Sequence, residues 1–147
     1  MQESAGGVNA VTDEVRRVEY YYATVPDKPG ESLKVLSALE NAGVLLLAYY
    51  AFPVGGGQAQ VDLVPADVGK FKQTADAAGF KLTGPKRAFL ITGNDRVGAA
   101  AEHAKKLADA KINITAVTAL GAGSGRYSMI LWVAPADHEK AATALGV

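Results

Sequence analysis

The sequence contains no cysteine, and its formal net charge is zero, with fifteen basic and fifteen acidic residues. The lack of cysteine excludes a disulfide framework, thiol catalysis and cysteine metal sites, and it fits a reducing cytoplasm. The balanced charge provides no overall field to attract nucleic acid or an anionic membrane. The longest apolar run, residues 42–54, is shorter than the about 20 residues that span a bilayer. We therefore expect a cytoplasmic protein that binds neither nucleic acid nor membrane.

Sequence motifs of common enzyme active sites are also missing. The chain has no Gly-x-Ser-x-Gly elbow, no His-Glu-x-x-His pair and no phosphate-binding loop. The glycine runs at 55–57 and 121–125 lack a following Lys-Ser/Thr, and we expect hairpin turns there. His103 and His138 have no partner at metal-ligand spacing. We expect no catalytic residue, no metal site and no cofactor.

A repeat organises the 147 residues. An offset of 68 residues (95 − 27) places Asp27 on Asp95 and the first glycine-rich turn on the second. Beyond these turns the offset becomes 70, and the Pro-Ala-Asp triplet at 65–67 falls on the triplet at 135–137. Because the motifs recur in the same order, the sequence predicts two similar units.

Each copy has the same predicted succession of elements. In the first copy, the sequence favours strands at 18–25, 44–52, 58–64 and 80–82, a helix at 31–41 and a second helix ended by Gly79. In the second copy, it favours strands at 88–92, 112–120 and 127–133, a helix at 97–110, and a last helix after 135–137. The inward residues of the helix at 97–110 are expected to be Val97, Ala101, Ala104 and Leu107. This is the β-α-β-β-α-β pattern of a ferredoxin-like unit. The predicted fold is α+β, with antiparallel sheets and helices on one face.

The predicted boundaries are a flexible lead-in at 1–17, a first unit at 18–85 and a second unit at 86–147. Gly84-Pro85 is expected to interrupt the regular secondary structure between the two units. The second copy stops at Val147, where its fourth strand would begin. An open sheet edge invites unwanted pairing, so we expect this edge to be covered. The N-terminal lead-in and a neighbouring subunit are the two candidates.

The turns at 25–32 and 93–98 each connect a strand to a helix. The prolines of the first turn fix the backbone, and its glycine permits a close approach. The free N–H groups of the helix that follows suit a carboxylate or a phosphate.

The chain resembles tandem ACT-domain proteins over residues 18–147. The similarity rests on the residues at 27–30 after the first strand, on those at 94–98 in the second copy, and on Ile112-Asn113-Ile114. The family consists of small regulatory modules that sense amino acids. The resemblance implies that a ligand lies between paired modules and touches the first loop of one module and the second strand of the other. The residues that match the family's ligand site are Asp27, Lys28, Gly30, Asn94, Asp95, Arg96, Gly98 and Asn113.

Within this set the two copies differ. Asn113 matches a strand asparagine of the family, whereas the first copy has Leu45 at the equivalent position. We therefore expect one polar ligand site and one more apolar site.

Other interpretations of these residues stay open. Asp27 and Asp95 are also typical helix caps, and Lys28 and Arg96 are also typical solvated side chains. The tyrosines at 20–22, 49 and 50 favour core or dimer-interface packing over ligand stacking. A ferredoxin-like unit also occurs in acyl-phosphate hydrolysis, which would need an arginine in a glycine-rich anion loop, and in RNA binding, which would need a basic face.

The hypothesis is a non-catalytic regulatory protein that binds an amino acid at the interface between ACT units, forms a homodimer and regulates a protein partner. The alternative is a structural oligomerisation module with no ligand.

Overall fold

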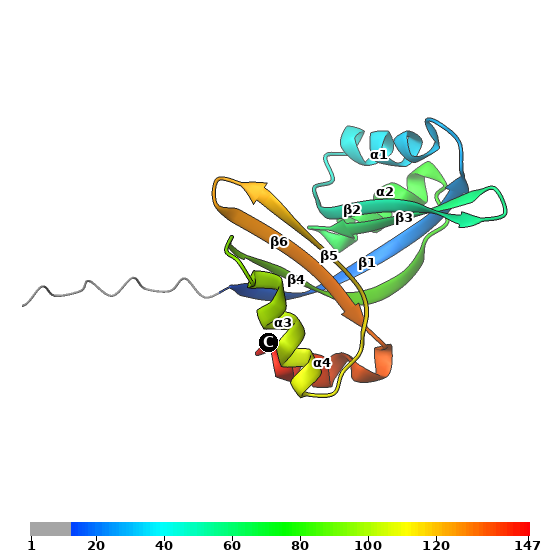
Figure 1. Ribbon diagram of the computed structural model, residues 1–147. Helices are drawn as coiled ribbons and strands as arrows, with labels where there is room; N and C mark the ends of the chain where they lie inside the picture. Colours follow the sequence, from blue (N-terminus) through cyan, green and yellow to red (C-terminus); the bar gives the residue numbers. More distant parts are fainter. Residues whose placement is uncertain (1–12) are drawn as a thin grey trace, which may run out of the picture. The chain divides into compact units, whose positions relative to one another are not determined.

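The structure, a computed structural model, describes residues 13–147. The first twelve residues of the predicted lead-in lie outside the described residues. Figure 1 shows the elements in chain order, which are β1 (Glu14–Pro26), α1 (Glu31–Asn41), β2 (Leu46–Gly55), β3 (Gln58–Pro65), α2 (Val68–Ala78), β4 (Thr83–Asn94), α3 (Ala99–Asp109), β5 (Ile114–Gly123), β6 (Arg126–Val133), the 3-10 turn η1 (Pro135–Asp137) and α4 (His138–Leu145). The predicted α+β class with antiparallel strands is confirmed.

The chain divides into two compact units. One is the unbroken stretch Val18–Ala88, and the other combines the residues up to Arg17 with Phe89–Val147. The strand order is β2-β3-β1-β4 in the first of these units and β1-β4-β6-β5 in the second. Both orders are those of a ferredoxin-like sheet, and β1 and β4 each contribute residues to both units.

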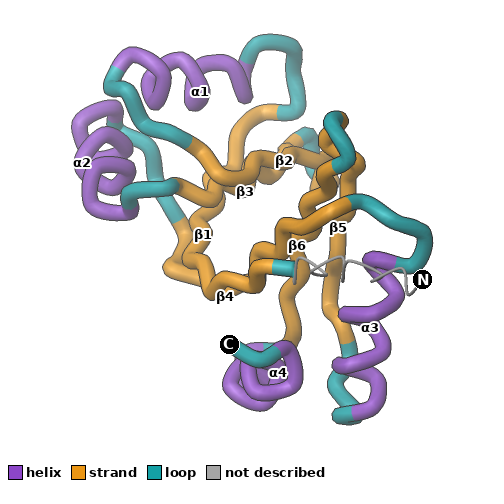
Figure 2. Tube along the Cα trace, turned by 90° about the vertical axis from the view of Figure 1, so that its left-hand side faces the viewer, coloured by secondary structure: helices purple, strands orange, loops and turns teal. Residues whose placement is uncertain are grey.

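The unit of residues 18–88 packs its two helices on one face of its sheet (Figure 2). Val61 and Leu63 alternate along β3 toward the helices and are fully buried with Val35 of α1 and Phe71 of α2. The Asp67 carboxylate accepts a 3.0 Å hydrogen bond from the Lys70 N–H and caps α2. The alternation along β3 therefore places Val61 and Leu63 on the face that becomes the core. The Asp67 cap fixes where α2 begins above that face.

The second unit has a core of the same kind. Fully buried side chains from β4, α3 and β6 meet here, and the Phe89 and His138 rings stack at 4.6 Å. Its largest fully buried apolar residues are Phe89, Ile91, Leu107 and Leu131. The helices α3 and α4 carry the other side of this core, as the packing of Leu107 and Leu145 in the same cluster shows.

One sequence prediction about strands was wrong. Residues 80–82 form no strand, whereas the strand expected at 88–92 lies within the longer strand β4, which also includes Gly84 and Pro85. Pro85 lies near the beginning of the strand, where a missing N–H is tolerated. A methyl group on Gly84 would lie 2.8 Å from a ring carbon of Tyr21, so glycine permits a close approach of backbone there rather than a break.

The structure also begins β1 at Glu14, inside the predicted flexible lead-in at 1–17. Val15 packs partly buried against the core of the second unit, which gives this segment an apolar anchor. In the second unit β1 takes the outer position beside β4, where the missing fourth strand of the repeat would lie.

The predicted inward face of α3 was wrong in part. Leu107 is buried as expected, but Val97 is fully exposed, Ala101 is exposed, and the other buried residues are Ala99 and His103. Gly98 adopts the left-handed conformation with φ 86° and the helix begins after it, so Val97 lies outside the helix. The buried face therefore follows Leu107 back in steps of four residues.

A pocket at the N-terminus of helix α3

The first turn of α3 has amide groups without a side-chain cap. Gly98 is the cap residue and has no side chain to offer, while the Ala99 N–H donates to the Arg96 carbonyl at 3.2 Å. The next two amides, of Ala100 and Ala101, are those that a helix cannot satisfy internally. The dipole of the helix gives this end a partial positive charge.

A pocket of about 240 Å³ opens at this helix end. One wall is the turn and the first residues of α3, and the other is the end of β5 with Tyr127 of β6. The residues that line it are Asp95, Arg96, Gly98, Ala99, Ala100, Ala101, Ala119, Leu120, Gly121 and Tyr127. Three predicted site residues, Asp95, Arg96 and Gly98, therefore lie together.

Asp95 contributes an exposed carboxylate to this pocket. Its N–H donates to the Gly125 carbonyl at 2.8 Å, which fixes the turn against the β5–β6 hairpin. A methyl group on Gly121 would lie 3.5 Å from Asp95 Oδ2, so the carboxylate lies over the end of β5. The pocket lining thus includes an anionic oxygen and the first residues of a helix.

Arg96 has no N–H group left for a further partner. Two of its N–H groups donate to Asp13 at 3.1 Å each, two to Glu102 at 3.3 and 2.6 Å, and one to the Asn94 carbonyl at 2.9 Å. A guanidinium has five N–H donors, so all are engaged. The hydrogen bond from Arg96 lowers the pKa of Glu102, and these partners together raise the pKa of Arg96.

Asp13 is the centre of a buried polar cluster behind the pocket. Its side chain is only 5% exposed and that of His103 only 2%. His103 Nε2 lies 2.8 Å from Asp13 Oδ2 and 3.1 Å from the hydroxyl of Tyr127, which itself donates a short hydrogen bond to Asp13. His103 Nδ1 is buried without a hydrogen-bond partner in the part of the chain that the structure describes.

Hydrogen bonding decides the charge state of this cluster. Burial alone would raise the pKa of Asp13, but the hydrogen bonds from Arg96, Tyr127 and His103 outweigh burial and hold that pKa well below its ordinary value of 3.8. Burial and the neighbouring Asp13 carboxylate raise the pKa of Tyr127 to about 12. Asp13 is therefore an anion and Tyr127 a neutral donor at neutral pH.

The remaining predicted site residues of the second copy are not in the pocket lining, and the structure separates Asn113 from it, because Asn113 follows the C-terminal end of α3. Asn94 ends β4, and its side-chain oxygen accepts a 2.8 Å hydrogen bond from Arg126 across the sheet. Asn113 is exposed in the connection between α3 and β5.

In the first copy, Asp27, Lys28 and Gly30 form the equivalent exposed turn before α1. The Asp27 N–H donates to the Gly57 carbonyl at 2.9 Å, as that of Asp95 does to Gly125. Gly30 has φ 86°, the same value as Gly98. The repeat is therefore reproduced in the backbone of the two turns.

The sequence analysis missed the buried cluster. Asp13 was assigned to the lead-in, and Glu102 and Tyr127 were not considered for the site. His103 carried one usable signal, since it lies four residues before Leu107 and so on the same helix face. Nothing in the spacing of Asp13 pointed to partners more than 80 residues away.

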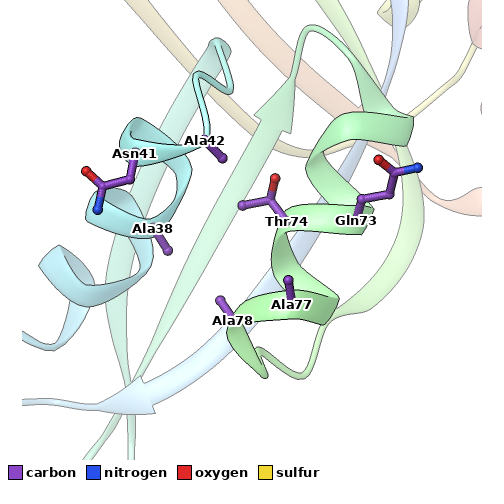
Figure 3. Close-up of a pocket in the computed structure, with 7 residues that line it drawn as sticks. All are labelled: Ala38, Asn41, Ala42, Gln73, Thr74, Ala77 and Ala78. Atoms are coloured by element: carbon purple, nitrogen blue, oxygen red, sulfur yellow. The ribbon is translucent and has the colours of Figure 1, made fainter.

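A second hollow lies between α1 and α2 in the unit of residues 18–88. It measures about 480 Å³, and Figure 3 shows the small and polar side chains that line it, which are Ala38, Asn41, Ala42, Gln73, Thr74, Ala77 and Ala78. It contains no charged side chain and lies on the outer side of the helix pair.

Within residues 13–147 no group of three or more His, Asp or Glu side chains converges as metal ligands. No helix in the same stretch is long and apolar enough to cross a membrane.

Comparison with solved structures identifies the fold. The regulatory subunit of aspartate kinase from Thermus thermophilus, in its ligand-free form, superposes with a TM-score of 0.63 over 93% of this chain and 97% of its own, at 20% identity. The chain has the ACT-type fold. The regulatory subunit from Thermus flavus gives a TM-score of 0.55 over 92% and 94% of the two chains, at 18% identity.

A third solved structure with a similar fold is protein BT0572 from Bacteroides thetaiotaomicron. It has a TM-score of 0.77 over 90% of this chain and 88% of its own, at 13% identity. No protein-family model and no curated protein sequence match the chain. The resemblance to tandem ACT-domain proteins is thus confirmed at the level of the fold.

Proposed function

We propose that this protein is a non-catalytic regulatory protein that binds a free α-amino acid in the pocket at the N-terminus of α3. The observation that carries the proposal is that Asp95 and the uncapped residues Ala100 and Ala101 line the same pocket. A free amino acid presents a carboxylate and an ammonium close together, and these lining groups match them. The shared fold with aspartate kinase regulatory subunits supports a regulatory role.

The other lining residues favour a small, uncharged ligand side chain. Ala99, Ala119 and Leu120 offer no group that would pair with a charge, and the volume is about 240 Å³. Every N–H group of Arg96 is engaged, so a ligand carboxylate can bond to the helix amides directly but to Arg96 only by displacing one of its present partners. The expected placement of the ligand between ACT units stays a prediction.

The test is a thermal-shift screen of all twenty amino acids. A ligand at a hundred times its Kd adds about 2.7 kcal/mol to the free energy of unfolding, which is a clear rise in midpoint. Asp95→Asn should weaken binding about tenfold or more, because it removes the anionic partner of the ammonium. Asp27→Asn is the matched control, since Asp27 has the equivalent turn position in the other copy.

Two outcomes would contradict this proposal. A screen without any rise in midpoint would remove the amino-acid ligand. Equal losses of affinity in Asp95→Asn and Asp27→Asn would show that the pocket at α3 is not the site.

A second candidate function is an oligomerisation surface without a ligand. The outer strand β2 exposes Tyr49, Phe52 and Val54 by 41 to 48%. Such residues on an outer strand are typical of a contact with a second copy or with a protein partner. Light scattering of the intact chain and of Phe52→Lys distinguishes the cases, because a homodimer through this face should dissociate in the variant.

The lack of cysteine supports a cytoplasmic location.

A further inference from the structure

The carboxylate of Asp13 occupies a site built for a carboxylate. Arg96 donates two parallel hydrogen bonds to it, and His103 Nε2 and the Tyr127 hydroxyl complete the set. Two parallel N–H bonds from one guanidinium are the strong, geometrically specific way to hold a carboxylate. The occupant comes from the chain itself.

This carboxylate site and the pocket share two residues. Arg96 and Tyr127 both contact Asp13, and both also line the pocket at α3. Because every N–H of Arg96 is engaged, an incoming carboxylate that bonds to Arg96 must replace one of its present partners. The two occupants, Asp13 and a ligand carboxylate, therefore compete.

The strand segment that follows Asp13 pairs with β4 but buries little apolar surface. Of Glu14, Val15, Arg16 and Arg17, only Val15 packs partly buried against the core. At the other end of this segment, Arg17 bonds to Glu139 at 3.0 Å and to the Val147 carbonyl at 3.2 Å, in an exposed position. An edge segment with little apolar burial opens at low free-energy cost.

We propose that Asp13 is an internal competitor of the amino-acid ligand, so that a carboxylate bound at Arg96 and Tyr127 displaces Asp13 and loosens residues 14–17 from the edge of the second unit. This inference rests on the proposed function and adds the structural change that ligand binding would cause. The ligand signal becomes a change at one sheet edge, where unpaired backbone groups can then accept another strand.

Glu102 is the competing explanation, because it also bonds to Arg96. Its side chain is 56% exposed, and among the residues that the structure describes its hydrogen bonds go to Arg96 and not to Tyr127 or His103. Asp13 is 5% exposed and touches Arg96, His103 and Tyr127. A carboxylate placed against both Arg96 and Tyr127 therefore competes with Asp13 rather than with Glu102.

The experiment measures the affinities of L-alanine, L-serine and L-valine for the full chain and for two matched variants. Asp13→Asn removes the competitor, and at least one of these amino acids should bind about 5-fold tighter or more. Glu102→Gln removes the other carboxylate on Arg96 and should change the affinity by less than about 2-fold.

Hydrogen exchange on the unmodified chain provides the second measurement and does not depend on the folding of a variant. Linkage is reciprocal, so the saturating amino acid should accelerate amide exchange in residues 14–17 by the factor that Asp13→Asn gains in affinity. Exchange in residues 127–133 of β6 should not accelerate.

The results separate this inference from the proposed function. If no amino acid binds to any of the three proteins, the proposed function fails and this inference fails with it. If an amino acid binds with equal affinity to the unmodified chain and to Asp13→Asn, or if only Glu102→Gln binds tighter, the competitor role alone is overturned. Unchanged exchange in residues 14–17 on binding also overturns it.

Discussion

Gly93 leaves the space that the Asp13 carboxylate fills. A methyl group on Gly93 would overlap this carboxylate and would lie 3.0 Å from a ring carbon of Tyr127. We expect Gly93→Ala to lower the free energy of unfolding by about 2 kcal/mol, because the carboxylate must leave its partners or strain the strand. Denaturant unfolding of the two proteins measures the difference.

Gly121→Ala is the matched control for this substitution. Gly121 pairs with the same Tyr127 from the other side, but a methyl group there would meet only ordinary contacts at 3.5 Å. Its effect should stay within about 0.5 kcal/mol. In the Asp13→Ala background, Gly93→Ala should cost almost nothing further; additive losses would contradict the steric explanation.

The charge of Asp13 predicts a loss of stability in acid. Its pKa is lower in the folded chain than its ordinary 3.8, so its contribution is fully present above that value and diminishes as the pH falls below it. Asp13→Asn should be about 2 kcal/mol less stable than the unmodified chain at pH 7, and this difference should shrink at pH 3. A constant difference across the titration would show that Asp13 is not ionised in the folded state.

The raised pKa of Tyr127 predicts a loss of stability at high pH. Burial and the Asp13 carboxylate raise its pKa from 10.0 to about 12, so its contribution is fully present below pH 10 and is lost as the pH rises through 12. Tyr127→Phe should therefore lose stability less steeply than the unmodified chain between pH 10 and 12. Unfolding midpoints of both proteins, measured across this pH range, test this expectation. If the midpoints of the two proteins fall equally steeply with pH, the ionisation of Tyr127 does not limit stability.

Substitution of Asp62 in β3 should stabilise the fold at neutral pH. This carboxyl group is 2% exposed, and burial raises its pKa above 3.8 in spite of Gln60 and Lys86. The folded state therefore resists ionisation, and stability falls as the pH rises above 3.8 and through the raised pKa.

Asp62→Asn should add about 1 kcal/mol to the free energy of unfolding at pH 7 and little at pH 3. Asp76→Asn on the exposed face of α2 is the control and should change stability by less than about 0.5 kcal/mol. A destabilised Asp62→Asn at pH 7 would mean that the ionised carboxylate is needed in the fold.

Local patterns predicted most of the fold. The helix expected at 31–41 has those bounds in the structure, and the strand at 58–64 gains only Pro65. Both segments carry their own information, in the three-to-four-residue spacing of Val35 and Leu39 and in the alternation of Val61 and Leu63. The repeat also predicted that Gly30 and Gly98 have equivalent positions, and each of them is the residue before a helix in the structure.

The sequence could not predict the interactions that depend on distant residues. Asp13 and Arg96 are 83 positions apart, and no spacing rule connects a carboxylate to a guanidinium over that range. The inclusion of Gly84 in β4 was hidden for a related reason, since the close approach of Tyr21 makes this glycine necessary. Asp95, Arg96 and Gly98 line one pocket because they share one turn, and their ligand role stays a prediction.

The division of the chain has a consequence for its synthesis. Residues 18–88 form one unbroken stretch, so that unit has all its residues as soon as Ala88 has left the ribosome. The other unit needs Glu14–Arg17 and also the helix that ends at Leu145. Its first strand segment is therefore translated before any other part of its sheet and must wait for nearly the whole chain before its neighbours exist.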